Sequence, residues 1–217
     1  VAHRLPAAGG GVVSAKGRKR RGAPATEVAD FEFYPTPPEA IDVILESHLV
    51  DLPGGVWIDP CAGTGRIPRT VNAYRRDVRW ILCEIDERHR ETLSTIARPG
   101  DVLLPFGDFV HREWRHPVAD VLIMNPPFSH ALNFVRAAFE RAAVVAMLQR
   151  STWIAPARAS FLRDHMPDVY ALPKRPSFTS DGGTDATEYA WFVWPDGLKR
   201  RFGRTAMLDL PRQRNLL

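Results

Sequence analysis

Short apolar segments alternate with amphipathic segments along the middle of the chain. The segments G-V-W-I-D (55–59) and A-D-V-L-I-M (119–124) have the length and composition of buried β-strands. In residues 38–49, apolar residues recur at helical spacing after Pro38, a residue favoured in a first helical turn. The pattern predicts further strands at 78–84, 101–106, 143–148, 169–173 and 188–194, and further helices through 71–74, 87–97, 132–142 and 157–165.

This alternation predicts an α/β fold of the Rossmann-like type. Seven short apolar strands separated by helices favour a mostly parallel sheet with helices on both faces. The last two predicted strands are too close together for a full helix between them. We therefore expect one strand near the C-terminus to be antiparallel.

Charge divides the chain into three parts. Residues 1–26 carry six basic residues and no acidic residue, and residues 196–217 carry six basic and two acidic residues. The intervening chain has 17 basic and 23 acidic residues. We expect a disordered basic tail (1–28), one catalytic domain (29–195) and a basic extension (196–217). Basic ends on an acidic body indicate a polyanionic partner such as nucleic acid, although they could also serve solubility alone.

Other classes of protein are disfavoured by composition. A hydrophobic content of 45% with 25% charged residues is typical of a globular protein, and no apolar run approaches the ~20 residues of a membrane span. Cys61 and Cys83 fit no zinc spacing, and the histidines fit none either. We expect reduced thiols, no metal, no membrane partner, and a place in the cytoplasm of a bacterial or phage-infected cell.

Polar and glycine residues follow the first two predicted strands. Parallel α/β sheets bind ligands at the carboxyl ends of their strands. The first strand ends in D-P-C-A-G-T-G (59–65), whose glycines allow a tight turn and close approach of a ligand. It is not a dinucleotide fingerprint, because Pro68 stands where a third glycine would be, and it lacks the lysine of a P-loop. Glu84 ends the second strand and could accept hydrogen bonds from ribose hydroxyls, with Asp86 as the alternative.

The third and fourth strands are followed by G-D-F (107–109) and N-P-P-F (125–128). Asp108 could accept from an adenine amino group and Phe109 could stack on its ring. The Asn125 amide oxygen, the Pro126 carbonyl and the flat ring of Phe128 suit a planar group with an exocyclic amine.

The ordered set Y-P-T-P, D-P-C-A-G-T-G, C-E-I-D, G-D-F and N-P-P-F resembles the class I amino-group methyltransferases that use S-adenosylmethionine. It is most similar to the small DNA N6-adenine methyltransferases carried by phages and prophages. Residues 172–194 also resemble the late region of that group, so the similarity covers roughly residues 31–195. The chain has no insertion large enough for a separate target-recognition domain, which leaves its sequence specificity open.

The resemblance implies two groups of site residues. Those implied for S-adenosylmethionine are Tyr34, Thr36, Pro37, Asp59, Pro60, Ala62, Gly63, Gly65, Glu84, Asp108 and Phe109. Those implied for catalysis are Asn125, Pro126, Pro127 and Phe128, with Asn125, Phe128 and Phe178 holding the target base. Phe178 could equally be a core residue, because a phenylalanine beside a strand more often is one.

The implied reaction is methyl transfer to the N6 amine of a flipped-out adenine in DNA by a monomer or weak dimer. Three alternatives stay open at this level. N-P-P-F also occurs in enzymes that methylate adenine or guanine in RNA, and N-P-P-[YF] occurs in glutamine methyltransferases. The third is a nucleic-acid-binding module without catalysis. The early Y-P-T-P and the late R-P-S-F (175–178) favour the DNA enzyme.

Overall fold

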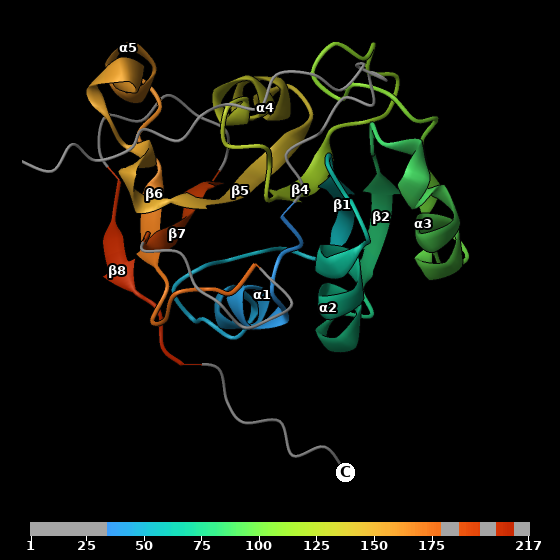
Figure 1. Cartoon of the computed structure of the whole chain (residues 1–217), viewed down its shortest axis with the longest axis horizontal. Coiled ribbons are helices and arrows are strands. Elements are labelled where there is room, and N and C mark those ends of the chain that lie inside the picture. Colours follow the sequence, from blue (N-terminus) through green and yellow to red (C-terminus); the bar gives the residue numbers. More distant parts are fainter. Residues whose placement is uncertain (1–33, 179–186, 196–202, 211–217) are drawn as a thin grey trace, which may run out of the picture. The chain divides into compact units, whose positions relative to one another are not determined.

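One sheet of eight strands, in the order β3-β2-β1-β4-β5-β7-β6-β8, organises the molecule (Figure 1). The computed structural model describes residues 34–178, 187–195 and 203–210. The strands are β1 (Gly55–Asp59), β2 (Val78–Leu82), β3 (Val102–Leu103), β4 (Ala119–Met124), β5 (Ala142–Arg150), β6 (Asp168–Ala171), β7 (Tyr189–Trp194) and β8 (Thr205–Met207). The helices are α1 (Pro38–Leu45), α2 (Arg66–Tyr74), α3 (Arg90–Ile96), α4 (Ala131–Phe139) and α5 (Ala159–Leu162), with 3-10 turns η1 (Glu87–His89), η2 (Ser151–Trp153) and η3 (Pro156–Arg158).

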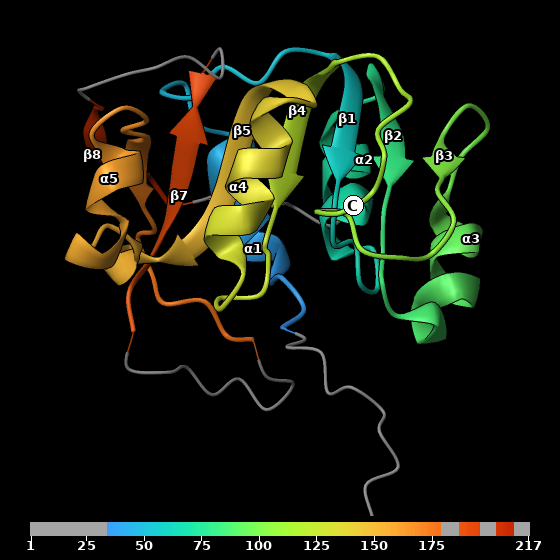
Figure 2. The ribbon, with the colours of Figure 1, turned by 90° about the horizontal axis from the view of Figure 1, so that it is seen from above.

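The sheet confirms the predicted parallel arrangement with a reversal near the C-terminus. Strands β1 to β5 pair in parallel, and β7 runs antiparallel to both of its neighbours, β5 and β6. Figure 2 shows the arrow of β7 pointing opposite to those of β1, β2 and β4. The basic N-terminal tail predicted for residues 1–28 lies outside the described residues.

In the described part of the chain the sheet has eight strands rather than the seven predicted, because part of the predicted basic extension pairs in parallel with β6 as β8. The carboxylate of Asp168, fully buried, accepts from the Arg204 backbone N–H at 2.6 Å and from its guanidinium at 3.1 Å. Sequence pattern missed β8 because a three-residue strand with exposed Thr205 and Met207 has no apolar periodicity.

Helices cover both faces of the sheet, as predicted. Apolar side chains of α1, α2 and α3 pack against one face of the sheet and form a first apolar cluster. Those of α4 and α5 pack against the other face and form a second. In Figure 1, α1 and α2 lie on one side of the strands while α4 and α5 lie on the other. No helix in the described part of the chain combines the length and apolar character needed to cross a membrane.

Buried tryptophans tie the sheet to the connecting segments. Trp57 and Trp80 pack edge to face at 5.8 Å, and the Trp57 indole donates to the Pro53 carbonyl at 2.8 Å. The Trp191 indole donates to the Ala40 carbonyl at 2.7 Å, which joins β7 to α1. All three tryptophans are at most 1% exposed and are core residues of the sheet.

The Trp191 hydrogen bond allows a clean test of its contribution to stability. Trp191→Phe should lower the free energy of unfolding by about 1–2 kcal/mol more than Trp153→Phe does. Both indoles are at most 2% exposed, but the N–H of Trp153 has no partner among the described residues. Denaturant unfolding measures the difference, and equal losses in the two variants would show that the Ala40 bond contributes nothing.

Candidate active site

The carboxyl ends of β1, β2 and β4 bring three of the predicted site segments to one edge of the sheet. Strand β1 pairs in parallel with β2 on one side and β4 on the other, so Asp59, Glu84 and Asn125 end neighbouring strands. The chain order reverses between β1 and β4. Open α/β sheets bind ligands at such a point.

The turn after β1 is tight, and only glycine can occupy position 65 in it. Gly63 and Gly65 have φ angles of 51° and 71°, and the Gly65 N–H donates to the Ala62 carbonyl at 2.7 Å. A Cβ atom at Gly65 would lie 1.9 Å from the Ile96 side chain. Helix α2 begins directly after this glycine without a side-chain cap, so its first N–H groups face the turn.

Asp59 carries an unusual carboxyl group at this edge. Its Oδ1 accepts from the Cys61 N–H at 3.3 Å, and its Oδ2 is buried without a hydrogen-bond partner among the described residues. Burial, with the negative charge of Glu84 adding to it, raises the pKa of Asp59 to about 8. A buried acceptor without a donor suits a ligand that brings a cationic N–H group.

Glu84 shapes the neighbouring backbone. Its Oε2 accepts from the Gly63 N–H at 2.6 Å, and its Oε1 accepts from the Ile85 and Asp86 N–H groups at 2.8 and 2.9 Å. Each carboxylate oxygen has two lone pairs, so binding of ribose by Glu84 stays a prediction compatible with these bonds. The alternative, Asp86, is engaged by the backbone and guanidinium of Arg88, and this pairing lowers its pKa.

The residues of G-D-F lie in different environments. Asp108 is exposed and accepts from the Val110 N–H at 2.8 Å and from His111 Nδ1 at 2.6 Å. Partial loss of solvent around the carboxylate opposes ionisation of Asp108, but the hydrogen bonds from His111 and Val110 prevail and its pKa is lowered. Phe109 is 2% exposed, stacks on Phe134 at 5.8 Å and lies under the Arg141 guanidinium. The expected stacking of Phe109 on an adenine is therefore not supported, because its ring is enclosed by the second apolar cluster.

Ile85 offers an apolar surface that sequence reasoning overlooked. It directly follows Glu84 at the end of β2, and 43% of its surface is exposed. The structural signal that identifies Ile85 as a site candidate is its exposure directly beside the buried carboxylate of Glu84. Its position would let it cover one face of a planar ligand bound by Glu84.

Hydrogen bonds within the described residues engage the nitrogen of the Asn125 side-chain amide but not its oxygen. Its Nδ2 donates to the Tyr34 carbonyl at 3.0 Å and to Thr36 Oγ1 at 3.1 Å. Its Oδ1 is buried and accepts no hydrogen bond from the described residues. Pro126 is buried beside it, and the Pro127 carbonyl accepts from the His130 N–H at the start of α4. Asn125 is thus a buried acceptor whose orientation is fixed by its own donors.

Several aromatic rings pack together in the segments that adjoin Asn125. Phe128 stacks on Tyr34 with centroids 5.3 Å apart, and Phe178 packs edge-on to Tyr34 at 6.2 Å. The structure also brings in Tyr189, 4.9 Å from Phe178, and the Arg150 guanidinium, 4.4 Å over the Phe128 ring. Sequence pattern missed both, because they lie on β5 and β7 and become neighbours of Phe128 only in the folded sheet.

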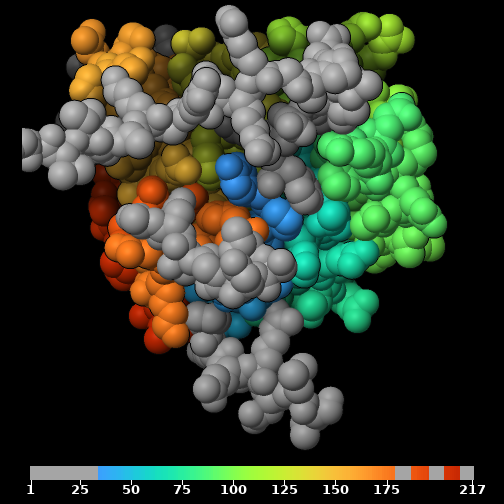
Figure 3. All heavy atoms as spheres, in the orientation of Figure 1, coloured from blue at the N-terminus to red at the C-terminus, as the bar shows by residue number. Residues whose placement is uncertain are grey.

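Tyr34 and Thr36, which the resemblance assigns to the cofactor, contact the N-P-P-F segment in the structure, and their role at the cofactor stays a prediction. Pro37 is buried and caps the start of α1. Figure 3 shows this first described stretch (blue) at the surface, between the orange residues that follow β6 and the teal residues of the β1–α2 region. The segment that precedes α1 thus adjoins the N-P-P-F segment.

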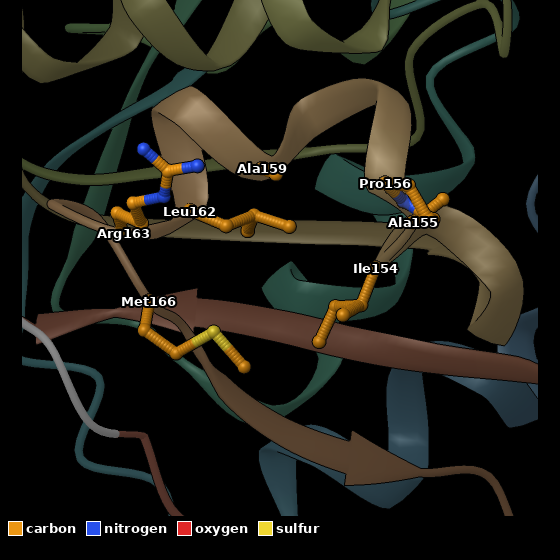
Figure 4. A pocket seen from close by; sticks show the side chains of 7 residues that line it. All are labelled: Ile154, Ala155, Pro156, Ala159, Leu162, Arg163 and Met166. Atoms are coloured by element: carbon orange, nitrogen blue, oxygen red, sulfur yellow. The ribbon is translucent and has the colours of Figure 1, made fainter.

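An open apolar groove of about 360 Å³ shares no lining residue with these strand ends. Its lining side chains come from η3, α5 and the segments beside them (Figure 4). They include Ile154, Pro156, Leu162 and Met166, with Arg163 as the one charged group, and none of the predicted site residues. No cluster of metal ligands occurs among the described residues. The candidate catalytic and binding residues therefore lie at the strand ends and not in this groove.

Comparison with known proteins shows the fold but no sequence family. No family model and no curated protein sequence matches the chain. The methyltransferase subunit of a type I restriction-modification system from Streptococcus thermophilus is similar in structure, with a TM-score of 0.63 and 16% identity over 82% of this chain and 47% of the subunit. The chain thus spans about half of that protein.

Two further solved structures are covered over most of their own length. A Pyrococcus horikoshii protein assigned as an RNA methyltransferase has a TM-score of 0.56 and 20% identity over 76% of this chain and 87% of its own. The precorrin-6y C5,15-methyltransferase from Geobacter metallireducens has a TM-score of 0.50 and 16% identity over 72% and 87%. The three neighbours differ in substrate but share one architecture. The chain therefore has the fold of the class I methyltransferases.

Proposed function

We propose that this protein transfers a methyl group from S-adenosylmethionine to the N6 amine of adenine in DNA. One observation carries the proposal. The Asn125 Oδ1 is a buried acceptor with no donor among the described residues, at the end of the strand next to β1, and Phe128, three residues on, stacks on Tyr34. A planar base with an exocyclic amine supplies both the missing donor and a flat face.

Asn125 and Pro126 prepare the amine. The lone pair of an adenine amine is delocalised into the ring, which makes the nitrogen a poor nucleophile. Hydrogen bonds from the N6 protons to Asn125 Oδ1 and to the Pro126 carbonyl favour tetrahedral geometry and release that lone pair. No strong base is required, because the proton can leave to water after the new N–C bond has formed. Positioning and fixed dipoles supply the rate enhancement.

The residues at the β1 and β2 ends fit the cofactor. Asp59 Oδ2 is a buried acceptor that suits the amino group of the methionine part, and the turn at Gly63 and Gly65 allows close approach of a ligand. Glu84 would bind the ribose, and Asp108 with Ile85 would hold the adenine. When bound, S-adenosylmethionine supplies a methyl group on a positively charged sulfur, which is neutral once the methyl has been transferred.

DNA is the proposed polymer because of two sequence segments, while the charge of the chain ends favours nucleic acid in general. The early Y-P-T-P and late R-P-S-F segments resemble DNA enzymes. In the structure, Tyr34 of the first segment stacks on Phe128, and Phe178 of the second packs edge-on against Tyr34. The basic ends of the chain would attract the phosphate backbone of any nucleic acid. A base in a duplex must leave its stack before it reaches Asn125, and contact with Phe128 would offset part of that cost.

Transfer of a labelled methyl group tests this proposal. Purified protein is incubated with methyl-labelled S-adenosylmethionine and, separately, unmethylated DNA, RNA or a protein extract. We expect label on DNA. Label confined to RNA or to protein would replace the proposed substrate with one of the alternatives. A protein that binds DNA but neither binds nor consumes the cofactor would be a binding module.

A further inference from the structure

Asn125 reaches its two partners across a large distance in sequence. Tyr34 and Thr36 lie about 90 residues before it, in the segment that leads into α1. Thr36 is 5% exposed, and its hydroxyl oxygen accepts from Asn125 Nδ2. The two side-chain N–H groups of Asn125 are thereby both bonded, at 3.0 and 3.1 Å.

An amide side chain has two orientations that exchange its oxygen and its nitrogen. A backbone carbonyl accepts hydrogen bonds and never donates them, so the Tyr34 carbonyl disfavours the orientation that turns Oδ1 toward it. The Thr36 hydroxyl adds a second acceptor in the observed orientation. Pro35 and Pro37 flank Thr36 and fix the backbone of this segment through their rings. The acceptors are therefore presented on a stiff piece of chain.

We propose that Thr36, with the Tyr34 carbonyl, is a positioning residue that keeps the Asn125 amide oxygen turned toward the target base. This inference rests on the proposed function. It departs from the role that the resemblance implies, because Thr36 acts through Asn125 and contributes little to cofactor affinity. The signature of this role is a loss of turnover with unchanged cofactor binding.

Thr36→Val removes the hydroxyl but keeps the shape, and Thr36→Ser keeps the hydroxyl. We expect Thr36→Val to lower kcat for DNA methylation about five- to thirtyfold, as loss of one hydrogen bond to a group that must be oriented predicts. The dissociation constant for S-adenosylmethionine should change by less than about twofold, and Thr36→Ser should restore kcat to within about threefold of the parent. Thr70→Val, which alters a buried threonine in α2, is the matched control and should leave kcat unchanged.

A double-mutant cycle separates positioning from direct contact. If Thr36 acts through Asn125, Thr36→Val should have almost no further effect on kcat in an Asn125→Ala background. Weakened cofactor binding with unchanged kcat in Thr36→Val would overturn the inference in favour of a cofactor contact. Independent losses in the two variants would also contradict it.

A measurement on the protein without substrate keeps this inference distinct from the proposed function. The side-chain amide resonances of Asn125, assigned by their absence in Asn125→Ala, should exchange with solvent faster in Thr36→Val than in the parent or in Thr36→Ser. If the parent methylates no polymer but shows this difference, the proposed function fails while the positioning contact stands. Identical exchange in all three proteins would show that Thr36 does not hold the amide.

Discussion

Replacement of Asn125 by alanine will reduce methyl transfer by on the order of 10²–10³-fold and leave the affinity for S-adenosylmethionine unchanged. This magnitude is typical for loss of one preorganised hydrogen-bonding group that acts mainly in the transition state. The substitution removes the buried Oδ1 acceptor, whereas the carboxylates of Asp59 and Glu84, which are proposed to bind the cofactor, are untouched. Single-turnover kinetics with saturating cofactor measure the chemical step, and calorimetry measures cofactor binding.

Asn125→Asp is the sharper companion variant. It keeps the size of the side chain but replaces the amide N–H donors with an oxygen that would face the Tyr34 carbonyl and Thr36 hydroxyl. We expect it to be as impaired as alanine, because the carboxylate loses its fixed orientation. Asn133→Ala, on the exposed side of α4, is the control and should be fully active. Normal turnover in either Asn125 variant would refute the role of the amide.

Replacement of Asp59 by asparagine should raise the free energy of unfolding while it weakens cofactor binding. In the ligand-free protein, burial and then the charge of Glu84 raise the pKa of Asp59 to about 8. The folded state therefore holds a proton that the unfolded state releases near pH 4. Asp59 thus favours folding fully only below about pH 4, and this contribution is lost as the pH rises toward 8. Asp59→Asn should raise the free energy of unfolding by on the order of 3 kcal/mol at pH 8 and hardly at all at pH 4.

The same carboxyl group should make cofactor binding depend on pH. A cationic amino group prefers the ionised carboxylate, so the affinity of the parent should fall by up to about tenfold per pH unit below pH 8. Asp59→Asn should bind weakly and without this dependence. Asp120→Asn, an exposed carboxylate near the opposite end of β4, should behave like the parent in both assays. A parent whose cofactor affinity is constant between pH 6 and pH 8 would contradict the role of Asp59.

Sequence pattern predicted the parts of the fold that have strong apolar periodicity. Strands β1 and β4 begin and end where the pattern placed them, because each contains an uninterrupted apolar run, 56–58 in β1 and 121–124 in β4, with polar or glycine residues on both sides. The edge strands were harder to place. β3 is only two residues long, and β8 has two exposed side chains, so neither has a face that burial could mark in the sequence.

The candidate site was predicted where a motif directly follows a strand. Asp59, Glu84 and Asn125 all lie at neighbouring strand ends, since parallel pairing brings them to one edge. Contacts between distant segments were not predictable. The pattern of residues 107–116 does not reveal that Phe109 turns inward against Phe134. The pattern around residues 34–36 does not reveal that Tyr34 and Thr36 bond to Asn125. These depend on loop geometry, which local sequence specifies weakly.

The position of the transferred methyl group tests the central claim most directly. Unmethylated DNA is incubated with S-adenosylmethionine and the parent protein or Asn125→Ala, digested to nucleosides, and analysed by mass spectrometry. The parent should produce N6-methyldeoxyadenosine, and Asn125→Ala should produce at least 100-fold less in the same time. Methylation at another base, or equal N6-methyldeoxyadenosine from the two proteins, would contradict the assignment of Asn125 as the acceptor for the adenine amine.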